Sequence, residues 1–411
     1  MNPRRVFFPF LIGVSVLVSF LPALGDGFTN WDDQKNFLEN YGYRGLAPAN
    51  LKWMVTSFLL GHWIPLTWLS LGLDYAVWGM NPLGYHLTSL VLHTANAVLL
   101  YHLIRLLLRL SGQEPTPIAA FAGALAYAIH PLRVESVVWI TERRDVLCGF
   151  FVLLSVLAHL KRVEEERQGR SGARWGILSV VAYGASLLSK ALGILLPAVL
   201  LLLDLYPLGR WKQGSRRRAI LEKLPYVALS FADAVAMSFA MRNIQAVRPI
   251  GGYHFAERAA QAAYGLTFYL LKTIWPAGLI PLYRIDPDLN PAALKYLLAL
   301  AAVAGLTAIL ILRRRRLPGA LVAWLAYIVL VFPVLGVALT GMQIAADRYT
   351  YLCLLPSSVL VTVVLNRLDR SGSRARRPGL VAAAGALAIL GFLTFQQSQI
   401  WKDSITLWTH E

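Results

Sequence analysis

The sequence is poor in charged residues and in cysteine. Only 15% of its 411 residues are Asp, Glu, Lys or Arg, whereas a typical soluble domain carries about a quarter. The two cysteines, Cys148 and Cys353, cannot form a disulfide framework and do not have the spacing of a metal site. The composition therefore argues against an ordinary soluble domain, a disulfide-stapled secreted domain and a cysteine-based metal module.

The apolar residues are gathered into long blocks. Hydrophobic residues make up 57% of the chain, and most of them fall in blocks of roughly 17–22 residues, the length that crosses a hydrocarbon core of about 30 Å. The blocks do not alternate apolar and polar residues, as the strands of a membrane barrel would. Because lipid-exposed backbone must satisfy its own hydrogen bonds, each block predicts a spanning helix. The expected fold class is an all-α polytopic membrane protein.

We predict eleven spanning helices, each about as long as one apolar block. They are residues 7–24, 85–108, 117–129, 146–160, 175–188, 191–208, 225–241, 291–312, 317–339, 349–365 and 379–395. The first block resembles a signal peptide, but its apolar run is long and the cleavage-like stretch 21–25 is weak, which favours an uncleaved span. Residues 262–276 are apolar but short and contain Lys272, so this segment is expected to be re-entrant or interfacial.

The net charge of +17 could suggest a nucleic-acid partner. However, most Lys and Arg residues lie in short loops between the predicted spans, including the runs 210–223, 313–316 and 367–377. Cytoplasmic loops of membrane proteins carry such an excess, so the charge indicates topology and we expect no nucleic-acid partner. If residues 262–276 do not cross, every basic cluster lies inside, the N-terminus is cytoplasmic and the C-terminus is outside.

The long segment between the first two spans, residues 26–84, is expected on the outer side. It contains five tryptophans: Trp31, Trp53, Trp63, Trp68 and Trp78. Because tryptophan is enriched at membrane–water interfaces, residues 54–60 and 63–77 are predicted to form amphipathic helices that lie on the membrane. The short loops elsewhere favour a bacterial inner membrane, where the outer side is the periplasm.

An acidic pair, Asp32 and Asp33, follows the first span. Two neighbouring carboxylates can raise the pKa of one of them, which suits that residue to act as a general base. The pair could equally bind a divalent metal ion, with water completing its coordination. The third alternative is structural: one of the two caps the helix that runs through Leu38.

Three further polar stretches are expected at the same membrane face. They supply nine candidate substrate-binding residues: His130, Arg133, Glu135, Arg144, Asp145, Lys190, Asp347, Arg348 and Tyr349. Arginine presents a fork of donors that suits a phosphate group, whereas the alternative for any single residue is a boundary salt bridge or a lipid headgroup contact. The convergence of four clusters on one face predicts a binding site.

These motifs resemble a known family. The resemblance is carried by Trp31-Asp32-Asp33 after the first span, His130-Pro131 with Glu135 and Arg144-Asp145, Ser189-Lys190, and Asp347-Arg348-Tyr349. In this order and at similar spacing they resemble the transmembrane and tetratricopeptide-repeat O-mannosyltransferases and their bacterial relatives, members of the GT-C superfamily of glycosyltransferases. The acidic pair is common to GT-C enzymes, whereas the stretch from His130 to Asp145 is more specific.

The resemblance implies a GT-C-like transmembrane domain over residues 1–395, with its outer loop at 26–84. Such enzymes transfer a sugar from a polyprenyl-phosphate or dolichyl-phosphate donor to an acceptor hydroxyl, with inversion. Asp32 or Asp33 would be the base, and Arg144, Lys190 and Arg348 would face the phosphate. The expected partners are a lipid-linked, mannose-like sugar donor, a protein or glycan acceptor and membrane lipid. No cofactor is certain, although a divalent metal ion could take part.

The family continues into tetratricopeptide repeats, and residues 396–411 resemble the start of a first repeat helix. No 34-residue period is present, so the repeats are expected to be truncated or absent. The alternative function is a non-catalytic membrane protein, either a lipid or solute transporter or a relative that only scaffolds partners. Transporters tend to show paired repeats with helices broken at mid-membrane, and the sequence shows no such pairing.

Overall fold

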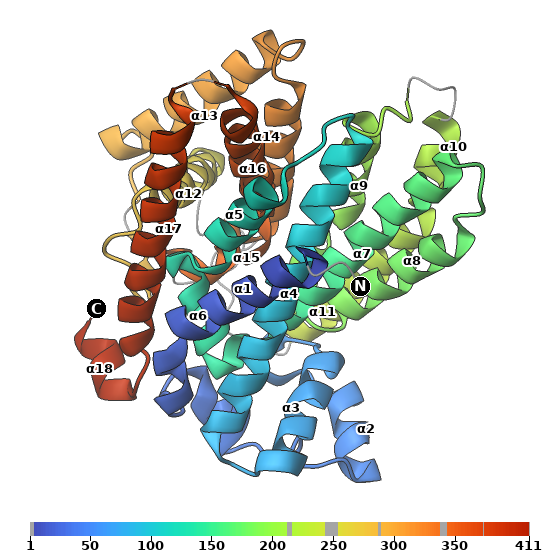
Figure 1. Cartoon of the computed structure of the whole chain (residues 1–411). Helices are drawn as coiled ribbons and strands as arrows, with labels where there is room; N and C mark the ends of the chain where they lie inside the picture. Colours follow the sequence, from blue (N-terminus) through green and yellow to red (C-terminus); the bar gives the residue numbers. More distant parts are fainter. Residues whose placement is uncertain are drawn as a thin grey trace.

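The computed structural model describes residues 4–211, 216–242, 254–286, 289–337, 343–372 and 374–410. These residues are mostly helical (Figure 1), with one small antiparallel sheet that pairs Tyr283–Arg284 (β1) with Gln343–Ala345 (β2). The longer helices are α1 (Arg4–Ser19), α4 (Pro82–Leu110), α5 (Pro117–Ala128), α7 (Arg143–Arg167), α8 (Ala173–Leu187), α9 (Leu196–Leu205), α11 (Leu224–Arg242), α12 (Phe255–Ile274), α13 (Leu294–Leu312), α14 (Pro318–Val331), α16 (Leu355–Arg370) and α17 (Arg376–Gln399). The shorter helices are α2 (Pro48–Thr56), α3 (Pro65–Trp78), α6 (Val134–Val138), α10 (Arg216–Leu221), α15 (Thr350–Cys353) and α18 (Ser404–Thr409).

Each of the eleven predicted spans overlaps one of the longer helices. Four described helices are long and apolar enough to cross a membrane: Pro82–Leu110, Ile140–Arg167, Leu294–Leu312 and Arg376–Gln399. Two bent pairs raise this number to six, and three shorter apolar helices lie at Val6–Ser19, Ala191–Leu205 and Pro318–Val334. The all-α architecture is therefore confirmed, and these helices are long and apolar enough for a membrane protein, whereas the number eleven stays a prediction. The segment 262–276 lies mostly in α12, which has 20 residues.

Two of the predicted spans are bent. α5 meets Pro131–Val138 at 55°, and Asp347–Cys353 meets α16 at 61°. At the first bend His130 is extended (φ −81°, ψ 136°), the conformation that a residue before proline prefers, and Pro131 cannot donate the hydrogen bond that would continue α5. The second bend lies just before a proline in the first turn of α16. Both bends occur where the sequence carries predicted site residues.

The centre of the bundle contains α4 and α7. In the apolar window of Ile140–Arg167, 67% of the residues are buried, against 6% in α17, so α17 lies at the periphery and leaves apolar side chains uncovered. One buried polar contact lies inside the bundle: His93 of α4 lies 2.8 Å from the Tyr351 hydroxyl and 2.9 Å from the carbonyl oxygen of Ala128. These contacts join α4, α5 and α15, as expected for polar side chains within a membrane domain.

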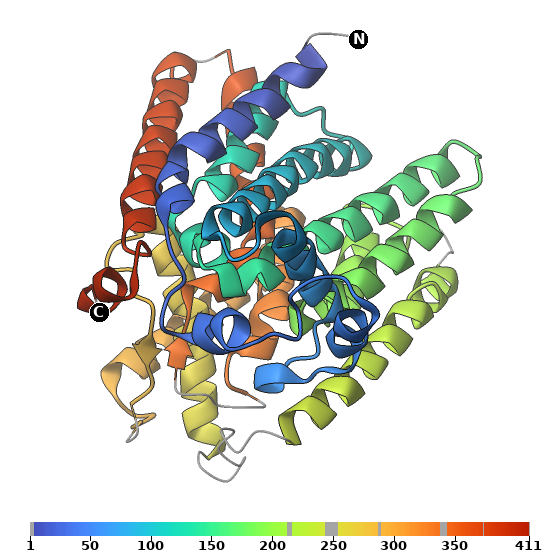
Figure 2. The same ribbon diagram turned by 90° about the horizontal axis from the view of Figure 1, so that it is seen from below.

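The first outer loop folds into a lobe at the lower end of the molecule, where α2 and α3 lie (Figure 1); seen from below, this blue lobe lies in front of the bundle (Figure 2). It has an apolar core of its own: Phe37, Tyr43, Met54, Ile64, Trp68, Leu71, Tyr85 and Ile140. The predicted helix 63–77 agrees with α3, but the predicted helix 54–60 was wrong. α2 begins earlier because Pro48 starts it, and Leu60 (φ 49°) interrupts the following residues.

The opposite, upper end of the molecule carries α10 and the junction of α13 and α14 (Figure 1). Its basic loop is held by a buried carboxylate, Asp204 at the end of α9. Asp204 accepts from Lys223 Nζ at 2.6 Å and from Arg210 at 3.3 Å, and it lies 2.9 Å from His159 Nε2. The described residues of the first basic run (210, 211 and 216–223) and the run 313–316 therefore lie at the end away from the outer-loop lobe.

Close packing of α5 against α16 depends on Gly123. A Cβ atom added there would lie 1.9 Å from Thr362 Oγ1 and 2.7 Å from the carbonyl oxygen of Ser358. We expect Gly123→Ala to lower stability by roughly 1–3 kcal/mol because the α16 backbone must move, measured as a lower melting temperature in detergent. Gly385→Ala in α17, with nothing within 4 Å of the added atom, is the matched control. Equal melting temperatures for the two variants would contradict this packing.

Candidate active site

Four segments that are far apart in the sequence meet beside the outer-loop lobe. They are residues 30–33, residues 139–145, Lys190 before the short helix η6 (Ala191–Gly193), and η9 (Asp347–Tyr349). The second segment is a turn because Trp139 is extended (φ −71°, ψ 117°) and ends α6, after which η5 (Ile140–Glu142) leads into α7. We call the charged and aromatic side chains of these segments, together with Glu135 of α6, the polar cluster.

Glu142 is the centre of the polar cluster and is fully buried. Its carboxylate accepts hydrogen bonds from Arg144 Nη2 (2.6 Å) and Lys190 Nζ (2.7 Å), and it lies 3.5 Å from Nε of Arg348. Three cations from three segments thus share one carboxylate. Because an isolated buried charge costs several kcal/mol, each partner makes the burial of the others possible. Glu142 was not among the predicted site residues, although its place within the stretch from His130 to Asp145 was a usable signal.

A second carboxylate, Asp145, shares Lys190 with Glu142. Asp145 accepts from Lys190 Nζ at 2.6 Å and, through its other oxygen, from Ser136 Oγ at 2.9 Å. The Lys190 side chain is only 13% exposed, so its ammonium group bridges two carboxylates in a largely water-excluded place. The structure therefore brings the predicted residues Arg144, Asp145 and Lys190 together.

Arg348 lies between a carboxylate and three aromatic rings. Its guanidinium pairs with Glu135, whose other oxygen accepts the Arg348 backbone N–H at 2.7 Å. The guanidinium carbon lies 5.9 Å from the ring centroid of Trp31, 5.6 Å from that of Trp139 and 5.1 Å from that of Tyr349. Ring faces attract cations at such distances. The predicted residues Glu135, Arg348 and Tyr349 therefore also meet.

The two adjacent carboxylates of the first outer loop have different surroundings. Asp33 is buried and accepts hydrogen bonds from Thr29 N (3.0 Å), Thr29 Oγ1 (3.1 Å) and Thr141 Oγ1 (2.6 Å). Burial raises the pKa of Asp33 to about 6, although these hydrogen bonds oppose the rise. The capping alternative is not realised, because Asp33 precedes the turn Gln34–Leu38 without a side-chain cap hydrogen bond. Asp33 instead fastens the loop to the segment that carries Glu142.

Asp32 is partly exposed, and its side chain has no hydrogen-bond partner within the ranges that the structure describes. Of the charges in the polar cluster, those of Arg144, Glu142 and Arg348 act on the Asp32 carboxylate. Partial burial raises the pKa of Asp32 above its ordinary value, and the positive charge of Arg144 opposes that rise. Asp32 is thus an unengaged carboxylate beside the cations of the polar cluster.

Two predicted residues, His130 and Arg133, contact other parts of the fold. His130 Nδ1 accepts the N–H of Leu132 (3.2 Å), so Nε2 donates to the carbonyl oxygen of Thr273 in α12 (3.0 Å). Arg133 is buried and donates to the carbonyl oxygen of Thr350 (2.8 Å) and to its hydroxyl. These bonds tie the first bend to α12 and to the second bend.

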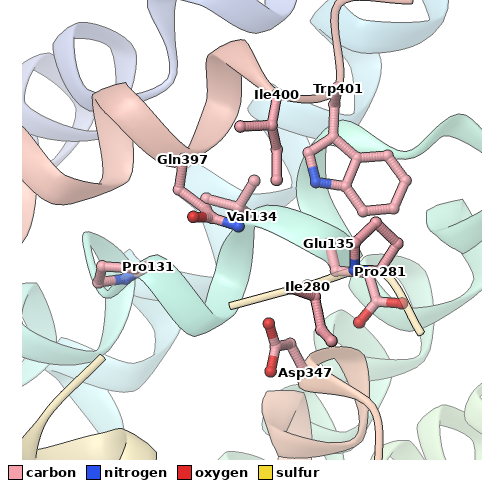
Figure 3. Close-up of a pocket in the computed structure, with 9 residues that line it drawn as sticks. All are labelled: Pro131, Val134, Glu135, Ile280, Pro281, Asp347, Gln397, Ile400 and Trp401. Atoms are coloured by element: carbon pink, nitrogen blue, oxygen red, sulfur yellow. The ribbon is translucent and has the colours of Figure 1, made fainter. Parts of the chain in front are cut away.

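Asp347 lies on the lining of a narrow hollow, too tight to hold a water molecule, that it shares with Glu135 (Figure 3). One of its oxygens accepts a hydrogen bond from the Tyr283 hydroxyl of β1 at 3.1 Å. The hollow is lined by Pro131, Val134, Glu135, Ile280, Pro281, Asp347, Gln397, Ile400 and Trp401. Glu135 and Asp347 are the two carboxylates on this lining, and Glu135 is already engaged by Arg348.

His62, in the first outer loop, was not predicted and lies beside the polar cluster. The chain that follows it is fixed next to Lys190, because Thr67 Oγ1 donates to the carbonyl oxygen of Ser189 at 2.9 Å. Burial, reinforced by the positive charges of Arg144 and Lys190, lowers the pKa of His62 to about 3, so the ring is neutral. The sequence feature that could have pointed to His62 as a site residue is its place in an aromatic, otherwise apolar segment.

Within the described residues, the acidic pair is not part of a set of side chains that could coordinate a divalent metal ion. No group of three or more His, Cys, Asp or Glu side chains is placed there to hold an ion. Asp33 is engaged by Thr29 and Thr141, whereas Asp32 lies next to cations. The two carboxylates therefore do not share a common set of neighbours.

Removal of the shared counter-charge should weaken the whole site. Glu142→Gln keeps the side-chain shape but leaves three buried cations short of one negative charge, so we expect a loss of roughly 3–5 kcal/mol of stability. Glu164→Gln is the control, because that carboxylate pairs with the more exposed Lys161 and Arg109, and exposed pairs contribute about 0–1 kcal/mol. Similar melting temperatures for the two variants in detergent would refute the central place of Glu142.

Comparison with known proteins places the chain beside protein O-mannosyltransferases. No family model matches it. It is 33% identical over 213 residues to protein O-mannosyl-transferase Tmtc1 of Drosophila melanogaster, covering 49% of this chain and 23% of that protein. It is 26% identical over 245 residues to TMTC4 of Homo sapiens (54% of this chain, 33% of that protein). Tmtc3 of Drosophila melanogaster is 24% identical over 489 aligned positions, and the alignment covers 99% of this chain and 51% of that protein.

The chain thus spans about half the length, or less, of these relatives. Among solved structures, the crystal structure of ArnT from Cupriavidus metallidurans bound to undecaprenyl phosphate is similar, with a TM-score of 0.49 and 13% identity over 96% of this chain and 76% of that chain. The resemblance that the motifs indicated is confirmed: the chain is similar, along nearly its whole length, to protein O-mannosyltransferases.

Proposed function

We propose that the chain is a membrane glycosyltransferase that moves a mannose-like sugar from a polyprenyl-phosphate or dolichyl-phosphate donor to a hydroxyl group of a protein or glycan acceptor. The similarity to protein O-mannosyltransferases supports the class of reaction. The observation that carries the proposal is the unengaged carboxylate of Asp32, whose neighbour Asp33 is hydrogen-bonded to Thr141, next to Glu142 and its cations. A base and a set of cations at one place suit the transfer of a sugar away from a phosphate.

In this proposal Asp32 is the general base. The acceptor hydroxyl gives its proton to the Asp32 carboxylate while its oxygen forms a bond to the anomeric carbon of the sugar. The bond between that carbon and the phosphate oxygen breaks, and the polyprenyl phosphate leaves with the electron pair. A single displacement from the opposite face inverts the anomeric configuration. Asp33, with its oxygens already hydrogen-bonded, holds the loop rather than taking the proton.

The cations of the polar cluster stabilise the leaving phosphate. Arg144 uses Nε and Nη2 on Glu142, and Arg348 uses Nη1 on Glu135. Nη1 of Arg144 and Nη2 of Arg348 have no hydrogen-bond partner among the described residues, which leaves N–H donors for phosphate oxygens. Because Glu142 and Asp145 hold the cations before the donor binds, little reorganisation accompanies the reaction.

The sugar is proposed to lie between the cations and the hollow of Figure 3. Glu135 and Asp347 would accept hydrogen bonds from sugar hydroxyls there. Tyr349, beside Arg348, would line the same space. The remaining predicted residues, His130 and Arg133, would support this arrangement by fixing the two bends.

The proposed orientation puts the site on the outer side of the membrane. The outer-loop lobe and α18 lie at one end of the molecule, and α10 and the α13–α14 junction lie at the other (Figure 1). Eleven crossings, with the N-terminus inside, fit this separation of basic loops from the site. Residues 1–395 would then form the membrane domain, residues 396–411 would begin an outer segment, and in a bacterium the site would face the periplasm.

Asp32→Asn should abolish most of the transfer without weakening donor binding. Asparagine cannot accept the proton, so we expect kcat to fall by at least about 100-fold while KM for the polyprenyl-phosphate sugar stays similar in liposomes. Wild-type kcat should rise with pH through the pKa of Asp32, which lies above 3.8, because only the ionised carboxylate is a base. Glu39→Gln, an exposed carboxylate of the same loop, is the control.

Equal activity in Asp32→Asn and Glu39→Gln would rule out Asp32 as the base. A wild-type chain that transfers no sugar from any polyprenyl-phosphate donor would favour the non-catalytic alternative.

Topology can be measured independently of activity. A reporter fused after Arg316 should read as cytoplasmic, and one fused after Glu411 should read as outer. An outer-side signal after Arg316 would contradict the eleven-span topology, because it would show that the basic run 313–316 lies on the outer face.

A further inference from the structure

The C-terminal segment folds back onto the loop that carries Asp32. α17 ends at Gln399, and after a turn α18 begins at Ser404, capped by Asp403, which accepts the N–H of Thr406 at 2.8 Å. In both views the red C-terminal turn lies beside the blue chain that follows α1 (Figures 1 and 2). Leu407 is fully buried, so α18 is packed against the protein rather than projecting from it.

Three hydrogen bonds join this segment to the four residues 27–30. The N–H of Gly27 donates to the carbonyl oxygen of Lys402 (3.1 Å), and the N–H of Asn30 donates to Ser404 Oγ (2.8 Å). The indole N–H of Trp408 donates to Asn30 Oδ1 at 2.7 Å. Residues 26–29 have no regular secondary structure, so their position depends on such contacts. Both bonds to Asn30 act two residues before Asp32.

An aromatic stack continues from the same segment into the polar cluster. Trp408 lies 5.3 Å from Trp31, which stacks on Trp139 at 4.6 Å with an interplanar angle of 21°. Trp139 stacks in turn on Trp401, at 5.6 Å. Because Trp31 and Trp139 also flank the Arg348 guanidinium, the C-terminal segment contacts both sides of the proposed reaction: the loop of the base and the rings around a phosphate-side cation.

We propose that residues 401–409 are a positioning element for the active site, in which Trp408 and Ser404 hold Asn30 so that Asp32 faces the cations. This inference rests on the proposed function. Asp33 fixes the loop through Thr141, and the C-terminal segment fixes it at Asn30, three residues before Asp33. With either anchor loosened, Asp32 would sample positions away from the acceptor hydroxyl, and small misplacements of a catalytic group are costly.

The test compares variants that each remove one hydrogen-bonding group. Trp408→Phe keeps an aromatic ring against Trp31 but deletes the donor to Asn30, and Ser404→Ala deletes one acceptor. We expect kcat for sugar transfer to fall between about 10- and 100-fold in Trp408→Phe, with KM for the donor lipid unchanged, and less in Ser404→Ala. The acid limb of the kcat profile should move to lower pH, because Asp32 gains solvent and burial is what raises its pKa.

The controls remove the same groups elsewhere. Trp275→Phe alters an indole that is 76% exposed, and Ser238→Ala removes an exposed hydroxyl of α11; both should keep wild-type kcat and pH profile. Wild-type kcat and profile in Trp408→Phe and Ser404→Ala would overturn this inference alone. So would a lower kcat together with a higher KM and a lower melting temperature at an unchanged pH profile, which marks a merely structural role. A wild-type chain without transferase activity overturns the proposed function, and this inference with it.

Discussion

Burying a lone charge costs several kcal/mol, and an opposite charge buried with it offsets part of that cost. In this protein the opposite charges meet at Glu142, which three cations share. Arg144 comes from α7, Lys190 from the turn before η6, and Arg348 from η9, so the relative position of three elements depends on one carboxylate. Apolar packing holds the spans together, but it does not fix how their polar ends meet, because apolar contacts are non-directional.

The same pairing prepares the proposed chemistry. The cations are held in place by Glu135, Glu142 and Asp145 before any ligand binds, and preorganised charges stabilise a leaving group without the cost of reorienting water. Asp32 stands outside this network of ion pairs. Its neighbour Asp33 is fully hydrogen-bonded to Thr29 and Thr141, so the fold engages one member of the acidic pair and leaves the other available.

The sequence predicted what local patterns determine. Apolar block length predicted the positions of the helices, and His130-Pro131 marks the first bend. Residues 54–60 were assigned wrongly because the proline that starts α2 outweighed the apolar pattern. The different surroundings of Asp32 and Asp33 could not be predicted, since Asp33 is engaged by Thr141, 108 residues away. Long-range contacts also decide where the predicted binding residues lie. They bring Arg144, Lys190 and Arg348 together at Glu142. They engage His130 and Arg133 at the two bends instead.

The most direct measurement of the central claim is the affinity of the purified protein for a polyprenyl phosphate and for the polyprenol of the same chain length. If the cations of the polar cluster receive the leaving phosphate, the wild-type protein binds the phosphate at least about tenfold more tightly, a difference of about 1.4 kcal/mol. Arg144→Gln should lose most of that difference, and Arg316→Gln, in the basic run at the opposite end, should retain it. Equal affinity of the wild-type protein for the phosphate and the alcohol would contradict the account.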